Sequence, residues 1–100
     1  MAGRDRYVND ITVTSAYDVP QYMDYVYADA SGGAFSVTLQ RTNDRRIREL
    51  TVQKIDDSAN AVTVTDGTLS YDLLVEDQAV ILRQKSSGLW FVASSSVAVS

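Results

Sequence analysis

The sequence contains no cysteine and no histidine among its 100 residues. Without cysteine, no disulfide can form in any compartment. Zinc and copper sites depend mostly on these two residue types, so ordinary sites for those metals are excluded. Histidine is also the usual general base near pH 7. Its absence excludes Ser-His-Asp and Cys-His catalytic arrangements.

Other features are scarce as well. Proline occurs once, and no apolar run approaches the roughly 20 residues of a membrane-spanning helix. The first ten residues, MAGRDRYVND, are charged and lack the apolar stretch of a secretory signal. Hydrophobic residues make up 45% and charged residues 22% of the chain, which is typical of one soluble globular domain. The net charge of −4 argues against a nucleic-acid partner.

What the sequence does contain is apolar residues in alternation. In the segment 61–65, Val62 and Val64 face one way and Thr63 and Thr65 the other, which is the pattern of a half-buried strand. The same reasoning predicts a strand in each of the following ranges: 7–17, 22–28, 34–39, 50–55, 61–65, 68–75, 78–83 and 89–93. No range has helical periodicity, and at most one helical turn is expected, within 40–49.

Turn-forming residues separate these ranges. Between 50–55 and 61–65 lies Asp56-Asp57-Ser58-Ala59-Asn60, and we expect 50–65 to form a β-hairpin. The segment DASGG at 29–33 and the segment around Gly88 predict two further hairpins. The predicted fold is all-β, with seven to eight short antiparallel strands in a sandwich or small barrel. Residues 1–6 are expected to form an N-terminal arm, 7–93 a single β domain, and 94–100 a C-terminal tail.

The loop at 56–60 also resembles the start of a calcium-binding loop. Asp56, Ser58 and Asn60 have the spacing of the first ligands of an EF-hand. That pattern then requires glycine at its sixth position and glutamate at its twelfth, where this chain has Ala61 and Gly67. The pattern therefore fails, a hairpin turn is expected instead, and we expect no metal and no cofactor.

Candidate catalytic groups lack a shared arrangement. The acidic pairs Asp56/Asp57 and Glu76/Asp77 lie in predicted turns, where solvated carboxylates are typical. A glycosidase-like pair would need a cleft and a raised pKa. No motif supports a Ser-Lys pair with Lys54 or Lys85. We therefore expect the protein not to be an enzyme.

A cluster of basic residues stands out between the predicted strands. Four of the nine basic residues crowd into one segment, at Arg41, Arg45, Arg46 and Arg48. This segment is either a docking patch or a solvated loop whose charge is offset by nearby acids. If it binds a partner, an acidic protein is favoured over DNA, because no aromatic residue lies among the arginines to stack on bases.

Aromatic residues suggest a further set of contacts. Tyr17, Tyr22, Tyr25 and Tyr27 are close together in sequence and indicate either cross-strand core pairs or a carbohydrate- or protein-binding surface. Trp90 is expected to be an anchor in the core or in an interface.

The last predicted hairpin breaks the alternation, since residues 79–82 and 89–92 are apolar on both faces. Such a strand must be covered on both faces, and a neighbouring subunit can supply the second cover. We therefore expect a homo-oligomer interface at Val80, Ile81, Leu82, Leu89, Trp90 and Phe91.

Three segments resemble a small β domain that is common in tailed-phage virion proteins. The segments are YVYADASGGAFSVTL at 25–39, LTVQKIDDSANAVTVT at 50–65, and 79–92 with Gly88 and Trp90 in matching places. They occur in the order of the family. The chain departs from the family pattern at Gln40, where the family has proline, in the arginine-rich segment that follows, and in a shortened connection at 66–68.

The resemblance implies a structural and attachment module that occurs in tail fibres, spikes and other projecting virion proteins, usually as a trimer, without catalytic residues. Because the domain here is nearly the whole chain, we expect a capsid decoration (cement) protein that contacts the major capsid protein or another virion protein. The alternatives are a short tail fibre, spike or adaptor, and a carbohydrate-binding module that uses the tyrosines. The protein is expected in the virion after synthesis in the host cytoplasm, with no membrane partner.

Overall fold

A computed structural model describes residues 9–20, 23–40, 48–85 and 88–96. Over these residues the chain forms nine strands and no helix, so the prediction of an all-β fold is confirmed. The strand count is slightly higher than expected. The strands are β1 (Asp10–Val13), β2 (Tyr17–Asp18), β3 (Tyr25–Ala28), β4 (Phe35–Thr38), β5 (Arg48–Lys54), β6 (Val62–Thr65), β7 (Ser70–Leu73), β8 (Ala79–Gln84) and β9 (Trp90–Ser96).

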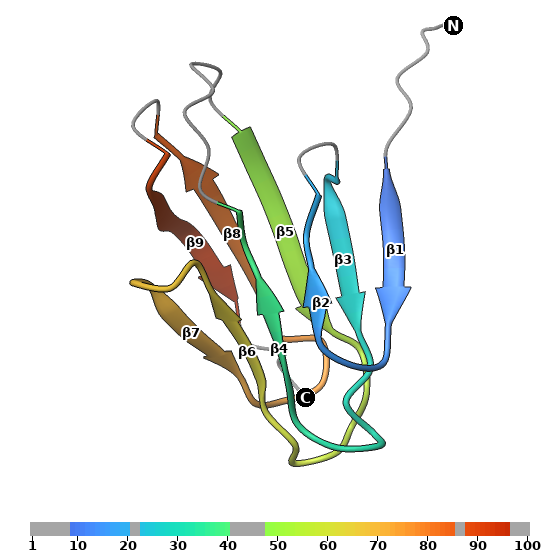
Figure 1. Ribbon diagram of the computed structural model, residues 1–100. Coiled ribbons are helices and arrows are strands. Elements are labelled where there is room, and N and C mark those ends of the chain that lie inside the picture. Colours follow the sequence, from blue (N-terminus) through green and yellow to red (C-terminus); the bar gives the residue numbers. More distant parts are fainter. Residues whose placement is uncertain (1–8, 21–22, 41–47, 86–87, 97–100) are drawn as a thin grey trace, which may run out of the picture.

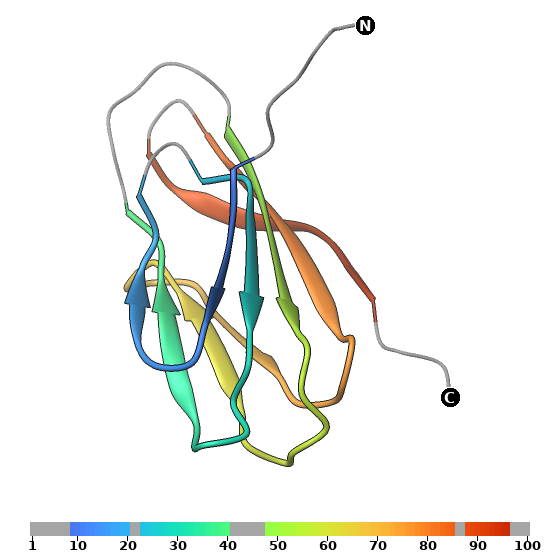
Figure 2. The same cartoon turned by 90° about the vertical axis from the view of Figure 1, so that its right-hand side faces the viewer.

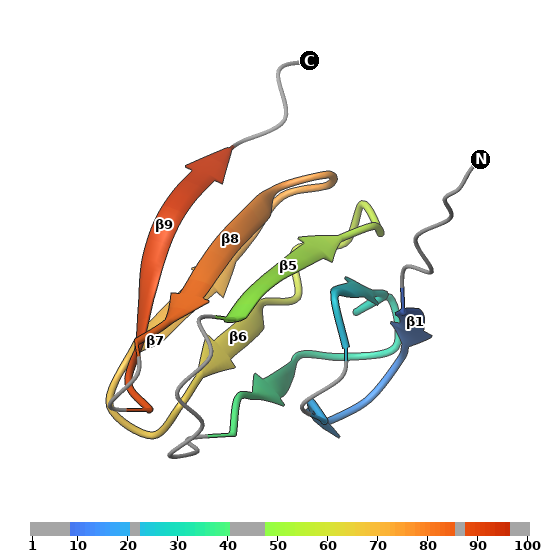
Figure 3. The same cartoon turned by 90° about the horizontal axis from the view of Figure 1, so that it is seen from above.

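The strands form two sheets that face each other (Figure 1). The five-stranded sheet has the order β1-β3-β5-β8-β9, and the four-stranded sheet has the order β2-β4-β6-β7. Figures 2 and 3 show the two sheets as separate layers, with the inward faces of both turned toward a shared interior. Of the two predicted alternatives, a sandwich and a small barrel, the structure shows the sandwich.

The path of the chain differs from the prediction. From β1 to β6 the chain passes back and forth between the sheets, so that strands two apart in sequence become parallel neighbours. Val26 of β3 lies opposite Val52 of β5, and Val37 of β4 lies opposite Val64 of β6. The antiparallel pairs are β5–β8, β8–β9 and β6–β7. The expectation of a wholly antiparallel fold is wrong.

Two predicted hairpins are corrected by this path. Residues 50–65 do not form a hairpin, because β5 and β6 belong to different sheets. Residues 29–33 likewise connect β3 to β4 across the sandwich. Alternation of apolar and polar residues indicates that a strand has one buried face, but it does not indicate which strand is its neighbour in the sheet. The hairpin around Gly88 is confirmed, since β8 and β9 pair directly.

The core lies between the sheets and follows the predicted alternation. In β6, Val62 and Val64 are fully buried while Thr63 and Thr65 are half-buried. In β8 the inward residues Val80 and Leu82 are also fully buried. The other buried apolar side chains are Val13, Val19, Met23, Val26, Ala28, Ala30, Val37, Leu39, Leu50, Val52, Leu73 and Trp90.

Several boundaries also shift. The strand predicted over 7–17 is divided into β1 and β2, with a turn at 14–16 between them. Strand β9 continues to Ser96, beyond the boundary expected after Ala93, because its last residues pair with the beginning of β8. A register shift between Ile81 and Leu82 lets β9 keep this pairing. The predicted arm, and most of the segment in which a helical turn was expected, lie outside the described residues.

Candidate functional site

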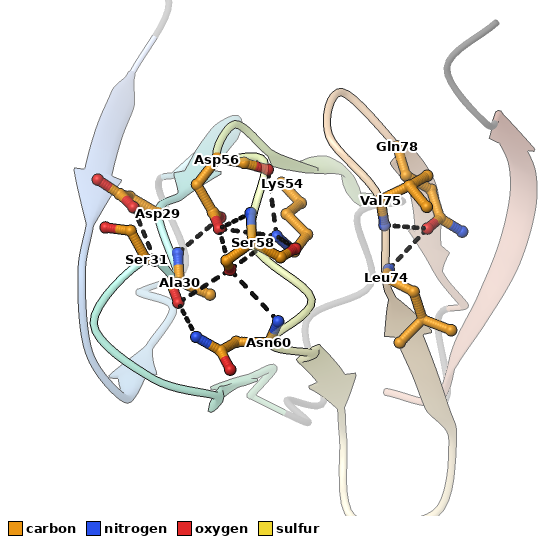
Figure 4. Close-up of polar contacts among 10 residues, drawn as sticks. All are labelled: Asp29, Ala30, Ser31, Lys54, Asp56, Ser58, Asn60, Leu74, Val75 and Gln78. Carbon is orange, nitrogen blue, oxygen red and sulfur yellow. Dashed lines mark hydrogen bonds and ion pairs between the residues drawn. The ribbon is translucent and has the colours of Figure 1, made fainter. Parts of the chain in front are cut away.

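A buried lysine forms the centre of the connection between β5 and β6. Alternation along β5 places Lys54 on the same inward face as Leu50 and Val52, and its exposed fraction is 0%. Its ammonium lies 2.8 Å from a carboxylate oxygen of Asp56 and donates to the backbone carbonyls of Asp56 at 3.1 Å and Ser58 at 2.8 Å (Figure 4). The charge is therefore matched, and its donors are used, within the same turn.

Asp56 is held from several directions. One carboxylate oxygen accepts the Ala30 N–H at 2.7 Å, and the other accepts the Ser58 N–H at 3.0 Å and the Ser58 hydroxyl. Burial alone raises the pKa of this carboxyl. The hydrogen bonds from Lys54, from Ser58 and from the two backbone amides outweigh burial and hold the pKa of Asp56 well below its usual range. The group is therefore ionised and serves as an acceptor.

The same turn is tied to the neighbouring connection at 29–34. The Asn60 side-chain amide donates to the Ala30 carbonyl oxygen at 2.8 Å, and the Ser58 hydroxyl oxygen, whose proton is donated to Asp56, lies 3.2 Å from the same carbonyl. The residues that resembled a calcium loop thus satisfy the backbone of a crossing between sheets. Their signal in the sequence was Lys54, because a lysine at an inward position of an alternating strand requires a buried partner.

A second buried aspartate organises the opposite end of β6. Asp66 accepts the N–H groups of Thr68 and Leu69 at 2.9 and 2.7 Å, which closes the turn between β6 and β7. Its other carboxylate oxygen accepts the Trp90 N–H at 3.3 Å. Because Trp90 belongs to the five-stranded sheet, Asp66 fastens the two sheets together at this end.

Two buried glutamines complete the set of internal polar groups. The side-chain oxygen of Gln78 accepts the N–H groups of Leu74 and Val75 at 2.7 and 3.3 Å, which fixes the turn before β8 (Figure 4). The Gln84 amide donates to the carbonyls of Gln40 and Gly88 at 3.2 and 3.0 Å. These groups, like the two aspartates, stabilise turns by satisfying backbone atoms.

Among the described residues, no group of three or more acidic side chains is placed to hold a metal ion. The described part of the chain also has no helix that is long and apolar enough to cross a membrane.

The predicted interface residues divide into two sets of three. Val80, Leu82 and Trp90 have exposed fractions of 0, 0 and 6% and belong to the core, so their assignment to an interface is corrected. They point inward because β8 and β9 each contribute one face to the sandwich. The others face away from the core: Ile81 is half-buried, and Leu89 and Phe91 are 37 and 38% exposed.

The arginine cluster lies almost wholly outside the described residues. Arg41, Arg45 and Arg46 precede the described part of β5, and Arg48 is the first residue of that strand. A patch formed by these four residues therefore stays a prediction.

The outward faces of the two sheets differ in chemistry. On the five-stranded sheet, Tyr25, Thr51 and Ile81 lie in register across three strands, and the parallel rings of Tyr25 and Tyr27 have centroids 6.4 Å apart. On the four-stranded sheet the corresponding row is Ser36, Thr63 and Asp72, in which the Thr63 hydroxyl donates to Asp72 at 2.8 Å. Tyr17 is half-buried and packs against the core, and Tyr22 lies outside the described residues. The aromatic and apolar contact surface therefore belongs to the five-stranded sheet.

No protein-family model matches the chain, and the search of curated proteins finds no match.

Proposed function

We propose that this chain is a structural subunit of a tailed-phage virion, a capsid decoration protein that stabilises the shell through protein–protein contacts. The proposal rests mainly on the outward face of the last hairpin. Its inward side chains complete the core, while Ile81, Leu89 and Phe91 leave an apolar surface on the other face. The resemblance at 25–39, 50–65 and 79–92 supports a virion module of this kind.

The buried polar groups support a role in assembly over one in catalysis. Lys54 and Asp56 neutralise each other, and Asp56 and Asp66 both accept backbone N–H groups. Groups used in this way hold turns in place and are poorly available for proton transfer to a substrate. The rigid sandwich that results can present the same surface on every copy.

The homo-oligomer that we propose is a trimer closed by the outward side of the last hairpin. Replacing Ile81 with aspartate places a charge in a dry interface, so the trimer is expected to dissociate. Ser36→Asp is the matched control, because Ser36 is exposed on the outward face of the other sheet. Light scattering should give about three times 11.0 kDa for the wild type and for the control. A wild-type monomer at micromolar concentration contradicts the trimer.

Location in the particle tests the virion role directly. Quantitative mass spectrometry of purified particles should find this chain at a copy number comparable to that of the shell subunit, and cryo-EM should place it on the head. A few copies per particle, with density on the tail, would support the alternative of a short tail fibre, spike or adaptor.

A carbohydrate-binding module is the third candidate, and the outward Tyr25–Tyr27 pair is the observation that favours it. Aromatic rings presented side by side on a sheet offer an apolar surface with polar hydroxyl tips. Glycan-array binding that is lost in Tyr25→Ala and Tyr27→Ala would establish this function, and absence of binding would exclude it for the glycans tested.

A further inference from the structure

The exposed large hydrophobic residues are not scattered evenly. Of the six among the described residues, Tyr25 lies on the open face of the five-stranded sheet and the other five gather at two places. Ile55, Leu74 and Val75, which we call the turn patch, lie where β5 and β7 end. Leu89 and Phe91, which we call the hairpin patch, lie at the turn between β8 and β9. Single exposed hydrophobic residues are normal on a protein surface, so what needs explanation is the grouping of these five residues and the charges around each group.

The turn patch is held by a fixed backbone. Leu74 and Val75 are 52 and 43% exposed, yet their N–H groups both donate to the buried side chain of Gln78. The Ile55 N–H donates to the Ala28 carbonyl at 2.9 Å, and the neighbouring Lys54 carbonyl accepts the Asp77 N–H at 2.7 Å. A turn whose backbone is already fixed loses little further backbone entropy on docking, which favours a specific partner.

The two patches have opposite charges around them. The exposed acids Asp57, Glu76 and Asp77 lie beside the turn patch, and the basic residue nearest to it in the chain, Lys54, is buried against Asp56. The hairpin patch has exposed Arg83 and Lys85 instead, and because Arg83 is paired with Glu49 at 3.4 Å, the excess positive charge beside this patch comes from Lys85. The Lys85 ammonium lies 5.7 Å from the centre of the Phe91 ring.

One copy of the chain cannot bring its own two patches together. They lie at opposite ends of strand β8 (Figure 1), whose six residues span about 20 Å. We propose that the turn patch of one copy docks against the hairpin patch of a second copy, apolar surface to apolar surface and acidic rim to basic rim. This inference rests on the proposed homo-oligomer and identifies what covers the hairpin patch.

The contact is heterologous, since two different surfaces of each copy meet. A closed ring of three requires that each contact turn the next copy by a third of a revolution. Every copy then uses both of its patches, and none is left exposed. An interface between identical patches would place like charges opposite each other, which is unfavourable.

The test uses Leu74→Glu in the turn patch and Phe91→Glu in the hairpin patch, with size-exclusion chromatography and light scattering. Both side chains are exposed, so circular dichroism should show an unchanged fold. Each variant alone is expected to lose the trimer, with association weakened by about tenfold or more. Ser36→Glu is the matched control, because Ser36 is exposed on the outward face of the four-stranded sheet and lies outside both patches, and it should remain trimeric.

Mixing the two variants separates this arrangement from any other. Phe91→Glu keeps its turn patch and Leu74→Glu keeps its hairpin patch, so the mixture should form a dimer of one copy of each. Glu76→Lys combined with Lys85→Glu in one chain should likewise restore the trimer that each substitution weakens alone.

The failures are distinguishable. A trimer that Phe91→Glu dissociates but Leu74→Glu leaves intact overturns the pairing of the two patches and leaves the proposed trimer standing. A monomeric wild-type chain overturns both, and the occupancy of purified particles then decides the virion role independently.

Discussion

Two turns of this molecule are each built on a buried aspartate, and they use it differently. Asp66 closes a turn between β6 and β7, two strands that are neighbours in one sheet, by accepting backbone N–H groups. Asp56 lies in a connection that leaves one sheet and enters the other, and it accepts a lysine ammonium and a serine hydroxyl as well as backbone N–H groups. In a hairpin, the strand pair beside the turn satisfies most of the backbone N–H and C=O groups. A connection that crosses between sheets has no such pair beside it, so side chains within the connection must satisfy its backbone groups.

The largest effect is expected when the ammonium is removed from the crossing. Lys54→Met leaves the Asp56 carboxylate buried without its cation, and the free energy of unfolding should fall by about 3–5 kcal/mol. Urea denaturation measures this change. The double variant Lys54→Met/Asp56→Asn should recover part of the loss, because a neutral amide keeps one oxygen to accept the Ala30 N–H. A loss below about 1 kcal/mol in the single variant would contradict a buried ion pair.

A smaller loss is expected at the hairpin turn. Asp66→Ala leaves the N–H groups of Thr68, Leu69 and Trp90 without their carboxylate acceptor, at a cost of about 1–3 kcal/mol in the free energy of unfolding. Asp66→Asn should cost less, since its side-chain oxygen can still accept. If Asp66→Ala destabilises more than Lys54→Met, the contrast between crossing and hairpin is wrong.

Acid should weaken the crossing. The folded-state pKa of Asp56 lies below its ordinary value of 3.8, so ionised Asp56 contributes stability that is fully present above that value. The contribution is lost as the pH falls below about 4, because the unfolded chain takes up the proton first, with a slope of at most about 1.4 kcal/mol per pH unit. The free energies of unfolding of the wild type and of Asp56→Asn, measured by denaturation at each pH, should converge over this range. A difference in free energy of unfolding that stays constant down to pH 2 would contradict the stabilising role of ionised Asp56.

The smallest effect is expected for a surface ion pair in the same sheet as Lys54. Arg83 and Glu49 lie 3.4 Å apart with side chains 52 and 58% exposed. Arg83→Ala should change the free energy of unfolding by less than about 1 kcal/mol. Salt screens exposed charges, so the difference in free energy between Arg83→Ala and the wild type should shrink further when salt is added. A change as large as that of Lys54→Met would show that burial does not set the difference.

The sequence predicts the strands of this fold better than their partners. The alternation at 61–65 correctly predicts β6 and its inward side chains. The segments 79–82 and 89–92, which are apolar on both faces, correctly predict the final hairpin. The same local pattern is compatible with a hairpin or with a crossing, and the structure shows that the hairpin predicted at 50–65 is a crossing between sheets. The partner of β5 is β3 on one side and β8 on the other, and both are distant in sequence.

The internal polar groups were visible in the sequence only in part. Lys54 stands at an inward position of an alternating run, and that position signals a buried partner within the next few residues. Asp66 and Gln78 carry no such signal, because a turn is also where solvated polar residues are typical. Their burial follows from the way the sheets close over the turns, which depends on tertiary contacts.

The position of β5 at the centre of its sheet also determines the order in which its two edges become paired during synthesis. When residues 48–54 leave the ribosome, β3 is already available as a parallel neighbour, but the other edge of β5 stays open until residues 79–84 follow. An unpaired edge is a site for association with other chains. The nascent protein therefore passes through a period in which its central strand has an open edge, and this period ends only when residues 79–84 have been made.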